Sequence, residues 1–320
     1  VSPDMAEDLS DANALIFSNA LNAHKVGELK KAENCLKILA DKGIATATNY
    51  LGFLYADEFK DYNKTAVYFH MAVEQGDPNA MYNLGVLYQV HLKDYEKAER
   101  CYLMAAERGS RNAMHNLGLL YEEPFKNYDK AKKYYQKAVD QGDPDAMHNL
   151  GLLYHKQFKD YDKAEIYYLM AVEQGEIDTL RNLALLYMDH LNNYKKAERY
   201  FKKAVEQNFI VDIYYLSFLN EYKVNNPQKA EKYFLKALES DLNNEDEDCA
   251  LLHFGNEDKE KKDLFYRLFK KYTKPDKDSH LFAMAFMALH SRHYKESVTC
   301  FKNALELAGA SMDQYQHGIT

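Results

Sequence analysis

The sequence predicts an all-α protein in which about nine helix-turn-helix repeats of 33 residues stack into a solenoid. Three observations predict this fold: a 33-residue recurrence of small and large apolar residues, a spacing inside each repeat that suits α-helices, and short turns rich in Gly, Asp and Pro. At 320 residues the chain is longer than a single hydrophobic core usually supports, so a core built by repetition is expected.

The first helix of each repeat is marked by a leucine followed by a small residue. Leu84 precedes Gly85, and Tyr88 follows the glycine by three positions. The small residue recurs once in each repeat, as Gly52, Gly85, Gly118, Gly151, Ala184 and Ser217. Because small side chains let helix backbones approach closely, this column predicts a packed seam between neighbouring helices.

The second helix of each repeat carries two alanines seven positions apart, such as Ala98 and Ala105. Seven residues are about two helical turns, so both alanines share a face, and Tyr102 between them is predicted to be buried on that face. Between repeats, Gly142-Asp143-Pro144 predicts a left-handed glycine, an Asp N-cap and a proline in the first turn of the next helix.

The phase of the repeat also divides the chain. Residues 1–42 are predicted to hold N-terminal capping helices and a divergent first repeat, and residues 43–240 six regular repeats. Residues 241–308 are predicted to hold two divergent repeats, and 309–320 a tail. The acidic stretch 243–263 favours a solvated loop, with a capping deviation as the alternative.

Composition excludes several classes of function. The net charge of −8 argues against nucleic-acid binding, which needs basic surfaces. Apolar runs are far shorter than the roughly 20 residues of a membrane-spanning helix, so no membrane insertion is expected. A cytoplasmic location is favoured, and a secreted or periplasmic one is the alternative if a leader has been removed.

The four widely spaced cysteines predict reduced thiols. Cys35 and Cys101 stand in the column that tyrosines fill in the other repeats, so they are interpreted as core residues of the second helix.

The segment Asn83–Gly109 resembles the tetratricopeptide repeat superfamily and, more closely, its Sel1-like branch. The features that carry the resemblance are the N-L-G-x-L-Y motif, the 13 residues from Gly85 to Ala98, and the short Gly-Asp-Pro turns. The loops between the paired helices, such as HLKDY, depart from the longer Gly-containing loop of that branch. The resemblance implies a right-handed α-α superhelix whose concave surface binds partners, commonly as an adaptor.

Side chains that share a helix face but vary between repeats are the candidates for binding a protein or peptide partner. On the first helix these lie three residues before, one after and four after the small residue, since residues three and four apart are neighbours on a helix. The one-after positions are apolar, for example Val86 and Leu119. The predicted binding residues of the outer two columns are Tyr82, Gln89, His115, Glu122, His148, His155, Arg181 and Met188.

An asparagine column, made of Asn83, Asn116, Asn149 and Asn182, lies immediately before the Leu-Gly pairs. Asparagine is a poor helix former, so its recurrence inside a helix needs a reason. One interpretation is that the amides hold an extended peptide backbone, as similar ladders do in some tetratricopeptide proteins. The other is that they bond neighbouring helices and fix the stacking of the repeats.

No catalytic residue, metal site or cofactor is predicted. His115, His148 and His155 raise the question of a metal site, but equivalent side chains of adjacent repeats stand about a helix diameter or more apart, too far to share a zinc ion unless longer rotamers converge. No nucleophile elbow, zinc-protease motif or phosphate-binding loop is present. The leading hypothesis is therefore an adaptor or scaffold. A β-lactam hydrolase of the Sel1-like type and a self-assembling solenoid are the alternatives, and a monomer is favoured.

Overall fold

A computed structural model describes residues 11–207, 211–242, 267, 268 and 271 of the chain. The chain divides into two compact units, residues 1–153 and residues 154–320. Within the described residues every regular element is helical, so the all-α prediction is confirmed.

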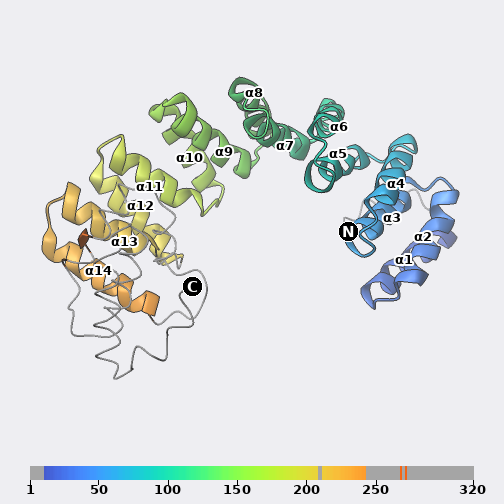
Figure 1. Ribbon diagram of the computed structural model, residues 1–320, viewed down its shortest axis with the longest axis horizontal. Helices are drawn as coiled ribbons and strands as arrows, with labels where there is room; N and C mark the ends of the chain where they lie inside the picture. The colour runs from blue at the N-terminus through green and yellow to red at the C-terminus, as the bar shows by residue number, and fades with distance from the viewer. Residues whose placement is uncertain (1–10, 208–210, 243–266, 269–270, 272–320) are drawn as a thin grey trace, which may run out of the picture. The chain divides into compact units, whose positions relative to one another are not determined.

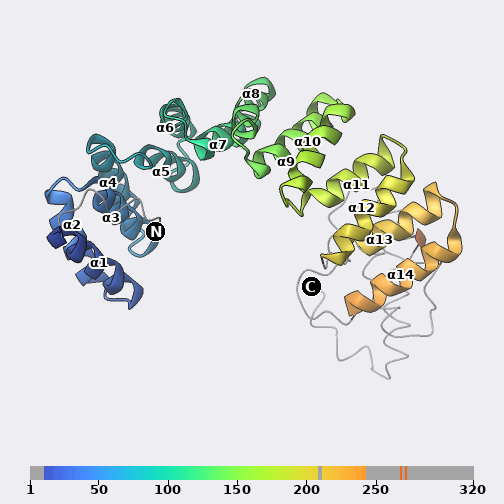
Figure 2. The same cartoon turned by 180° about the vertical axis from the view of Figure 1, so that it is seen from behind.

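The first unit consists of consecutive helices that pack against their neighbours in chain order (Figures 1 and 2). These are α1 (Asp11–Lys25), α2 (Leu29–Asp41), α3 (Ala45–Asp57), α4 (Tyr62–Glu74), α5 (Ala80–Val86) with a π-helical end η2 (Leu87–His91), α6 (Tyr95–Glu107), α7 (Arg111–Glu122), α8 (Tyr128–Val139) and α9 (Pro144–Leu153). We call the first helix of each repeat the A helix and the second the B helix.

The second unit continues the same pattern of A and B helices (Figure 1). It begins with the π-helical segment η3 (Tyr154–Phe158), followed by α10 (Tyr161–Glu173), α11 (Thr179–Asp189), α12 (Tyr194–Glu206), α13 (Val211–Phe218) with η4 (Leu219–Lys223), and α14 (Pro227–Leu242). The prediction of helix-turn-helix repeats is confirmed for seven pairs in the described part of the chain. The two divergent repeats predicted in 241–308, the acidic stretch 243–263 and the tail 309–320 lie outside the described residues, apart from isolated positions.

The small-residue column is explained by contact with the aromatic column of the B helix. Tyr102 is fully buried, and a Cβ atom added to Gly85 would lie 2.6 Å from its ring. Gly52 has the same relation to Phe69, at 2.5 Å. Since observed Cβ contacts are rarely below about 3.4 Å, the ring fills the space that a side chain would need. The predicted seam between the helices of a repeat is therefore present.

The turns between repeats follow the predicted chemistry. Gly142 has φ +75°, in the left-handed region, and the Asp143 carboxylate accepts a hydrogen bond from the backbone N–H of Ala146 at 3.0 Å. Helix α9 begins at Pro144, the position after this cap. These contacts satisfy N–H groups that the helix itself leaves unpaired.

The loop from A to B helix contains a feature that the sequence did not reveal. One non-glycine residue per repeat adopts positive φ between 51° and 56°, always just before the N-cap region of the B helix. These residues are Lys60, Lys93, Lys126, Lys159, Asn192 and Asn225. A lysine in this region carries a steric cost, whereas asparagine tolerates it better. The short loop therefore turns without glycine.

A second aromatic layer packs where the A and B helices meet. The repeat spacing places the ring of Tyr121 against that of Tyr134, with centroids 5.5 Å apart, and the Lys130 ammonium lies 4.7 Å from the Tyr121 centroid. The same stack occurs at Tyr154 with Tyr167 and at Tyr187 with Tyr200. Cys101 takes the position of the second tyrosine in its repeat and is buried, which confirms its interpretation as a core residue.

Alternate repeats add a carboxylate to this layer, buried at Glu33 and about a quarter exposed at Glu99 and Glu165. The hydroxyl of Tyr55 donates to Glu33 of the preceding B helix at 2.5 Å, and the pairs Tyr121–Glu99 and Tyr187–Glu165 form the same bond in every second repeat that follows. Glu33 is 3% exposed and also receives Lys30 at 2.7 Å and Lys37 at 2.5 Å. Hydrogen bonds from these three donors outweigh burial and lower the pKa of Glu33 to about 2.

Candidate functional site: the A-helix face

The candidate site is the face of the A helices that the three sequence columns define. We call it the A-helix face: the residues three before, one after and four after the small residue of each A helix. It is carried by α3, α5 with η2, α7 and α9 in the first unit and by η3, α11 and α13 with η4 in the second. Within the first unit these A helices follow one another along the stack, so each column continues from repeat to repeat (Figure 2).

The middle column of the A-helix face is apolar in every described regular repeat. Its members are Phe53, Val86, Leu119, Leu152, Leu185 and Phe218. Phe53 is 39% exposed, although its ring also packs against Phe69 with centroids 5.3 Å apart, and Leu119 is 38% exposed, so part of each large side chain is open to a partner. Phe53 and Phe218 were missed by sequence reasoning, although the period of the repeat extends to both. Phe218 differs because it is buried.

Three members of the asparagine column bond their A helix to the preceding repeat. In the first unit, the amide of Asn83 donates to Oδ1 of Asn49 at 3.0 Å, and that of Asn149 contacts Nε2 of His115 at 3.0 Å. Asn116 donates to the hydroxyl of Tyr102 at 3.1 Å and to that of Tyr82 at 3.4 Å. The geometry supports the stacking interpretation for these three residues. Asn182 is half-buried on α11.

Buried tyrosines of the B helices donate hydrogen bonds to side chains in the column four residues after the small residue. The hydroxyl of Tyr102 donates to Oε1 of Gln89 at 2.7 Å, and that of Tyr135 donates to Oε2 of Glu122 at 2.8 Å. Burial raises the pKa of both tyrosines, so they remain donors at neutral pH. In the second unit, Nδ1 of His155 lies 3.3 Å from the hydroxyl of Tyr168. These polar side chains are thus ordered at the surface of the face.

The column three residues before the small residue contacts an aspartate just before the start of the next A helix. Asn49 donates to Oδ1 of Asp77 at 3.2 Å. Two repeats further on, Nδ1 of His115 lies 3.6 Å from Oδ2 of Asp143, with Arg111 at 3.8 Å. Although burial alone would raise it, these neighbours hold the pKa of Asp143 below its usual range, whereas burial raises that of Asp77.

The remaining candidates differ in accessibility. Arg181 makes a two-pronged ion pair with the fully buried Asp212, with Nη2 to Oδ2 at 2.8 Å and Nε to Oδ1 at 3.0 Å. Met188 is only 7% exposed, so little of its side chain is available for contact, and His148 is half-buried. The A-helix face therefore offers its most accessible apolar surface in the first unit, at Phe53 and Leu119.

Three side chains lie close enough together to be considered as metal ligands, and they are not the histidine set that the sequence suggested. Donor atoms of His115, Asp143 and Asp145 lie within 4.8 Å of one another. Both His115 ring nitrogens already face partners, Asn149 and Asp143, and the carboxylate of Asp143 caps α9. The ordinary hydrogen bonds of a helix start account for this cluster.

The fold and the A-helix face define the class: an α-helical repeat protein whose modules stack in chain order. Sequence comparison makes this specific, because the Sel1 repeat pattern matches residues 45–77, 78–110, 111–143, 144–176 and 214–242, about half of the chain. The chain belongs to the Sel1 repeat family. A tetratricopeptide repeat pattern matches residues 178–209. The predicted family resemblance is confirmed.

Solved structures support the same fold. A protective antigen of uropathogenic Escherichia coli strains, described as displaying an SLR fold, is 20% identical with a TM-score of 0.60, over 96% of this chain and 72% of the other. The C-terminal part of a TPR repeat-containing protein from Cytophaga hutchinsonii is 18% identical with a TM-score of 0.56, over 72% of this chain and 96% of the other. At these identities the likeness shows the fold alone. No curated protein matches the sequence significantly.

Among the helices that the structure describes, none combines the length and the apolar character that crossing a membrane requires.

Proposed function

We propose that this protein is an adaptor or scaffold whose A-helix face binds a peptide or helix of a partner protein. The observation that carries the proposal is the apolar middle column, in which Phe53 and Leu119 are more than a third exposed. Polar His115 and Glu122 flank Leu119 on the same face. Burying such side chains against a partner is favourable by about 25 cal/mol per Å² of apolar area. The Sel1 family, to which the chain belongs, supports an interaction role.

The polar columns add hydrogen-bonding capacity to this apolar strip. The carbonyl oxygen of Gln89 accepts from Tyr102, which leaves its amide N–H groups directed away from that bond. Glu122 similarly uses Oε2 for Tyr135 and keeps Oε1 for another donor. Because these side chains are already ordered, they lose less conformational entropy when a partner binds than mobile side chains would. An extended backbone or the polar side of a helix would suit this arrangement.

The direct test is selection of peptides that bind the full chain, followed by affinity measurement on a matched panel. Phe53→Ser/Leu119→Ser removes apolar surface from the A-helix face, whereas Val67→Ser/Met104→Ser removes it from the B helices α4 and α6, where these residues are 62% and 47% exposed. We expect the first variant to lose at least tenfold in affinity and the second to stay within twofold. Equal losses in both variants would contradict the proposal.

The asparagine column receives its own test within this function. Titrating the selected peptide against Asn116→Ala/Asn149→Ala separates peptide binding from repeat stacking, provided that thermal unfolding shows the variant folded at the assay temperature. A loss of affinity by the folded variant would support a binding role for the amides. Unchanged affinity would leave them with the stacking role that their hydrogen bonds support.

Two alternatives have distinct readouts. Reproducible turnover of nitrocefin by the purified chain would favour β-lactam hydrolysis. A mass above that of the monomer by light scattering at high concentration would favour self-assembly, since solenoid ends expose helical faces. The cytoplasmic location and the absence of a nucleic-acid partner stay predictions alongside the proposed role.

A further inference from the structure

Basic charge is concentrated on one B helix of the second unit. The chain has a net charge of −8, yet α12 carries Lys195, Lys196, Arg199, Lys202 and Lys203 against only Glu198 and Glu206. The B helix of the preceding repeat, α10, carries one lysine and three acidic residues. Within the second unit α12 is therefore the basic exception among the described B helices, and in the first unit α8 has a comparable balance of four lysines to one aspartate.

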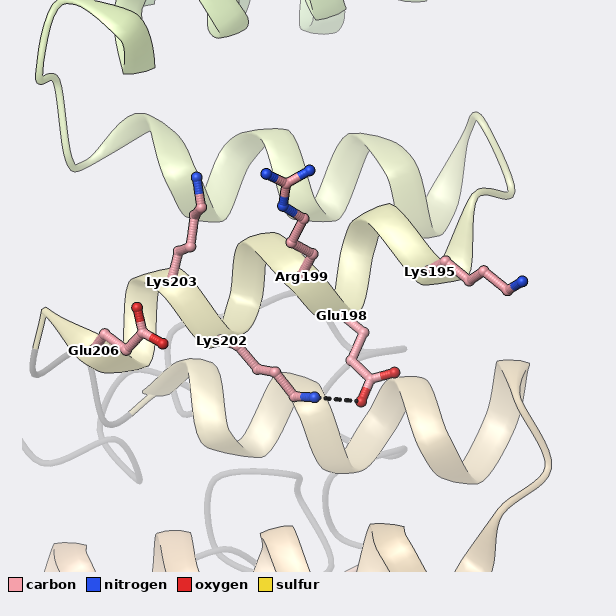
Figure 3. A pocket seen from close by; sticks show the side chains of 6 residues that line it. All are labelled: Lys195, Glu198, Arg199, Lys202, Lys203 and Glu206. Carbon is pink, nitrogen blue, oxygen red and sulfur yellow. Dashed lines mark ion pairs between the residues drawn. The ribbon is translucent and has the colours of Figure 1, made fainter.

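Four of these five basic residues, all except Lys196, line a shallow surface hollow of about 400 Å³ together with both glutamates of the helix. Figure 3 shows Arg199 and Lys203 projecting to the same side of α12, away from Lys202 and Glu198, which point toward each other. Lys202 is ion-paired with Glu198 at 3.0 Å, and Lys196, outside the hollow, is paired with Glu165 at 2.9 Å. The charges of these two lysines are thus already compensated by carboxylates of the protein itself.

Three cations of α12 have no ion pair among the described residues: Lys195, Arg199 and Lys203. The Arg199 guanidinium carbon lies 5.9 Å and the Lys203 ammonium 5.5 Å from the centroid of Tyr200, so this ring positions both. We propose that these three side chains bind an acidic segment of a partner protein in which Asp or Glu recurs at every second residue. This surface is separate from the A-helix face.

The spacing of the cations supports this register. Lys195, Arg199 and Lys203 follow one another by four residues, which is a rise of about 6 Å per step in an α-helix. Alternate residues of an extended strand are about 6.6–6.8 Å apart and point to the same side. Arg199 in the centre can hold a carboxylate through two parallel hydrogen bonds. An extended Glu-x-Glu-x-Glu segment therefore matches the three charges in turn.

An acidic peptide suits this surface better than a nucleic acid. Single strands also carry regularly spaced charges, but they place a phosphate at every nucleotide, so phosphates would also face Glu198 and Glu206, which flank the cations. A peptide segment can place neutral residues opposite these two glutamates. The short strip, about 12 Å from Lys195 to Lys203, needs only five peptide residues.

The probe is a fluorescent nine-residue peptide with Glu and Ser alternating, compared with a peptide of the same composition whose glutamates are contiguous. Fluorescence anisotropy at about 20 mM salt measures both affinities, because surface ion pairs are screened at higher ionic strength. We expect the alternating peptide to bind several-fold more tightly. Equal affinity for the two peptides, or tighter binding of a single-stranded oligonucleotide of similar length, would overturn the proposal.

Helix α8 supplies the matched control variant. Its Lys133 and Lys137 stand where α12 has Arg199 and Lys203, and they lie 5.7 Å and 5.2 Å from the Tyr134 centroid, but Asp129 replaces the third cation. Lys195→Gln/Arg199→Gln/Lys203→Gln should lower the affinity at least tenfold, and Lys133→Gln/Lys137→Gln should change it less than twofold. All substituted side chains are on the surface, and circular dichroism verifies that each variant is folded. Wild-type affinity in the folded α12 variant would refute the proposal.

The variant Phe53→Ser/Leu119→Ser separates this inference from the proposed function. It should bind the alternating peptide with wild-type affinity, because neither residue belongs to α12. A matching loss in that variant would mean that the peptide binds the A-helix face, and the α12 assignment would then be wrong.

Discussion

The side-chain amide of Asn149 lies 3.0 Å from Nε2 of His115, one repeat earlier on the preceding A helix. With Asn as donor, the imidazole accepts at Nε2 and presents Nδ1–H toward Asp143, the N-cap of α9. The His115 side chain thus connects α7, which carries it, to α9 and to the turn that precedes α9. The pairs Asn83–Asn49 and Asn116–Tyr82 repeat this link, so side chains predicted to bind a ligand also hold the stack together.

The first prediction concerns this link. Asn149→Ala removes a hydrogen bond from a partly buried site, so we expect the free energy of unfolding to fall by about 1–2 kcal/mol. The matched control is Asn63→Ala, which removes an exposed helical asparagine that makes no side-chain hydrogen bond in the described structure. Alanine is the better helix former, so the control should be neutral or slightly stabilising. Urea denaturation distinguishes the two, and equal effects would argue against the stacking role.

The second prediction concerns the buried carboxylate of Glu33. Its pKa of about 2 in the folded state lies below the ordinary value of 4.5, so the folded protein favours the ionised form. The stabilisation is therefore complete above about pH 4.5 and is lost as the pH falls toward 2. Glu33→Gln should cost on the order of 2 kcal/mol at pH 7 and progressively less below pH 4.5.

Urea unfolding of wild type and Glu33→Gln across pH 3 to 7 measures this difference. Glu96→Gln, which removes an exposed carboxylate from α6, is the control and should show little pH-dependent difference. A stability gap between wild type and Glu33→Gln that stays constant over this range would contradict the assigned role of the ion pairs with Lys30 and Lys37.

The third prediction concerns the seam between the paired helices. An added Cβ at Gly85 would lie 2.6 Å from the ring of Tyr102, which is fully buried. Gly85→Ala should therefore lower the free energy of unfolding by about 1–3 kcal/mol through overpacking, although alanine favours helix by about 1 kcal/mol. Thermal unfolding measures the net effect. A stabilised Gly85→Ala protein would show that the seam has room for a methyl group.

The fourth prediction concerns the left-handed residues of the A-to-B loops. Lys93 has φ +54°, and the equivalent positions of the last two described loops are Asn192 and Asn225. Lys93→Asn should raise the free energy of unfolding by about 0.5–1 kcal/mol, because asparagine tolerates this conformation better. Calorimetry tests the single variant and the set Lys60, Lys93, Lys126 and Lys159, whose effects should add. No gain in the fourfold variant would contradict the steric argument.

Much of the fold could be predicted because packing repeats the same residue types at the same interval. Gly85 and Tyr102 lie on different helices, yet the recurrence of both once in each repeat marked them as seam residues, and the buried ring shows why. The turn at Gly142-Asp143-Pro144 was equally readable, since each residue type has a strong local preference there. Such local chemistry is visible without coordinates.

Other features depend on contacts between repeats and could not be read locally. The left-handed Lys93 follows from the closure of a short loop, because lysine has no preference for that conformation. The partners of Gln89 and Glu122 are tyrosines of the B helix that follows, and nothing in the type of either residue specifies that bond. Phe53 lay within the same period as Val86, so the apolar column could have been extended to it.

The central claim is that a partner lies on the A-helix face. Its most direct test is photo-crosslinking of the selected peptide to full-length protein that carries a benzophenone amino acid either at Leu119 on α7 or at Met104 on α6. The two positions are similarly exposed, at 38% and 47%, in the same unit. The account predicts a crosslinked product from position 119 and none above background from position 104; the reverse pattern would contradict it.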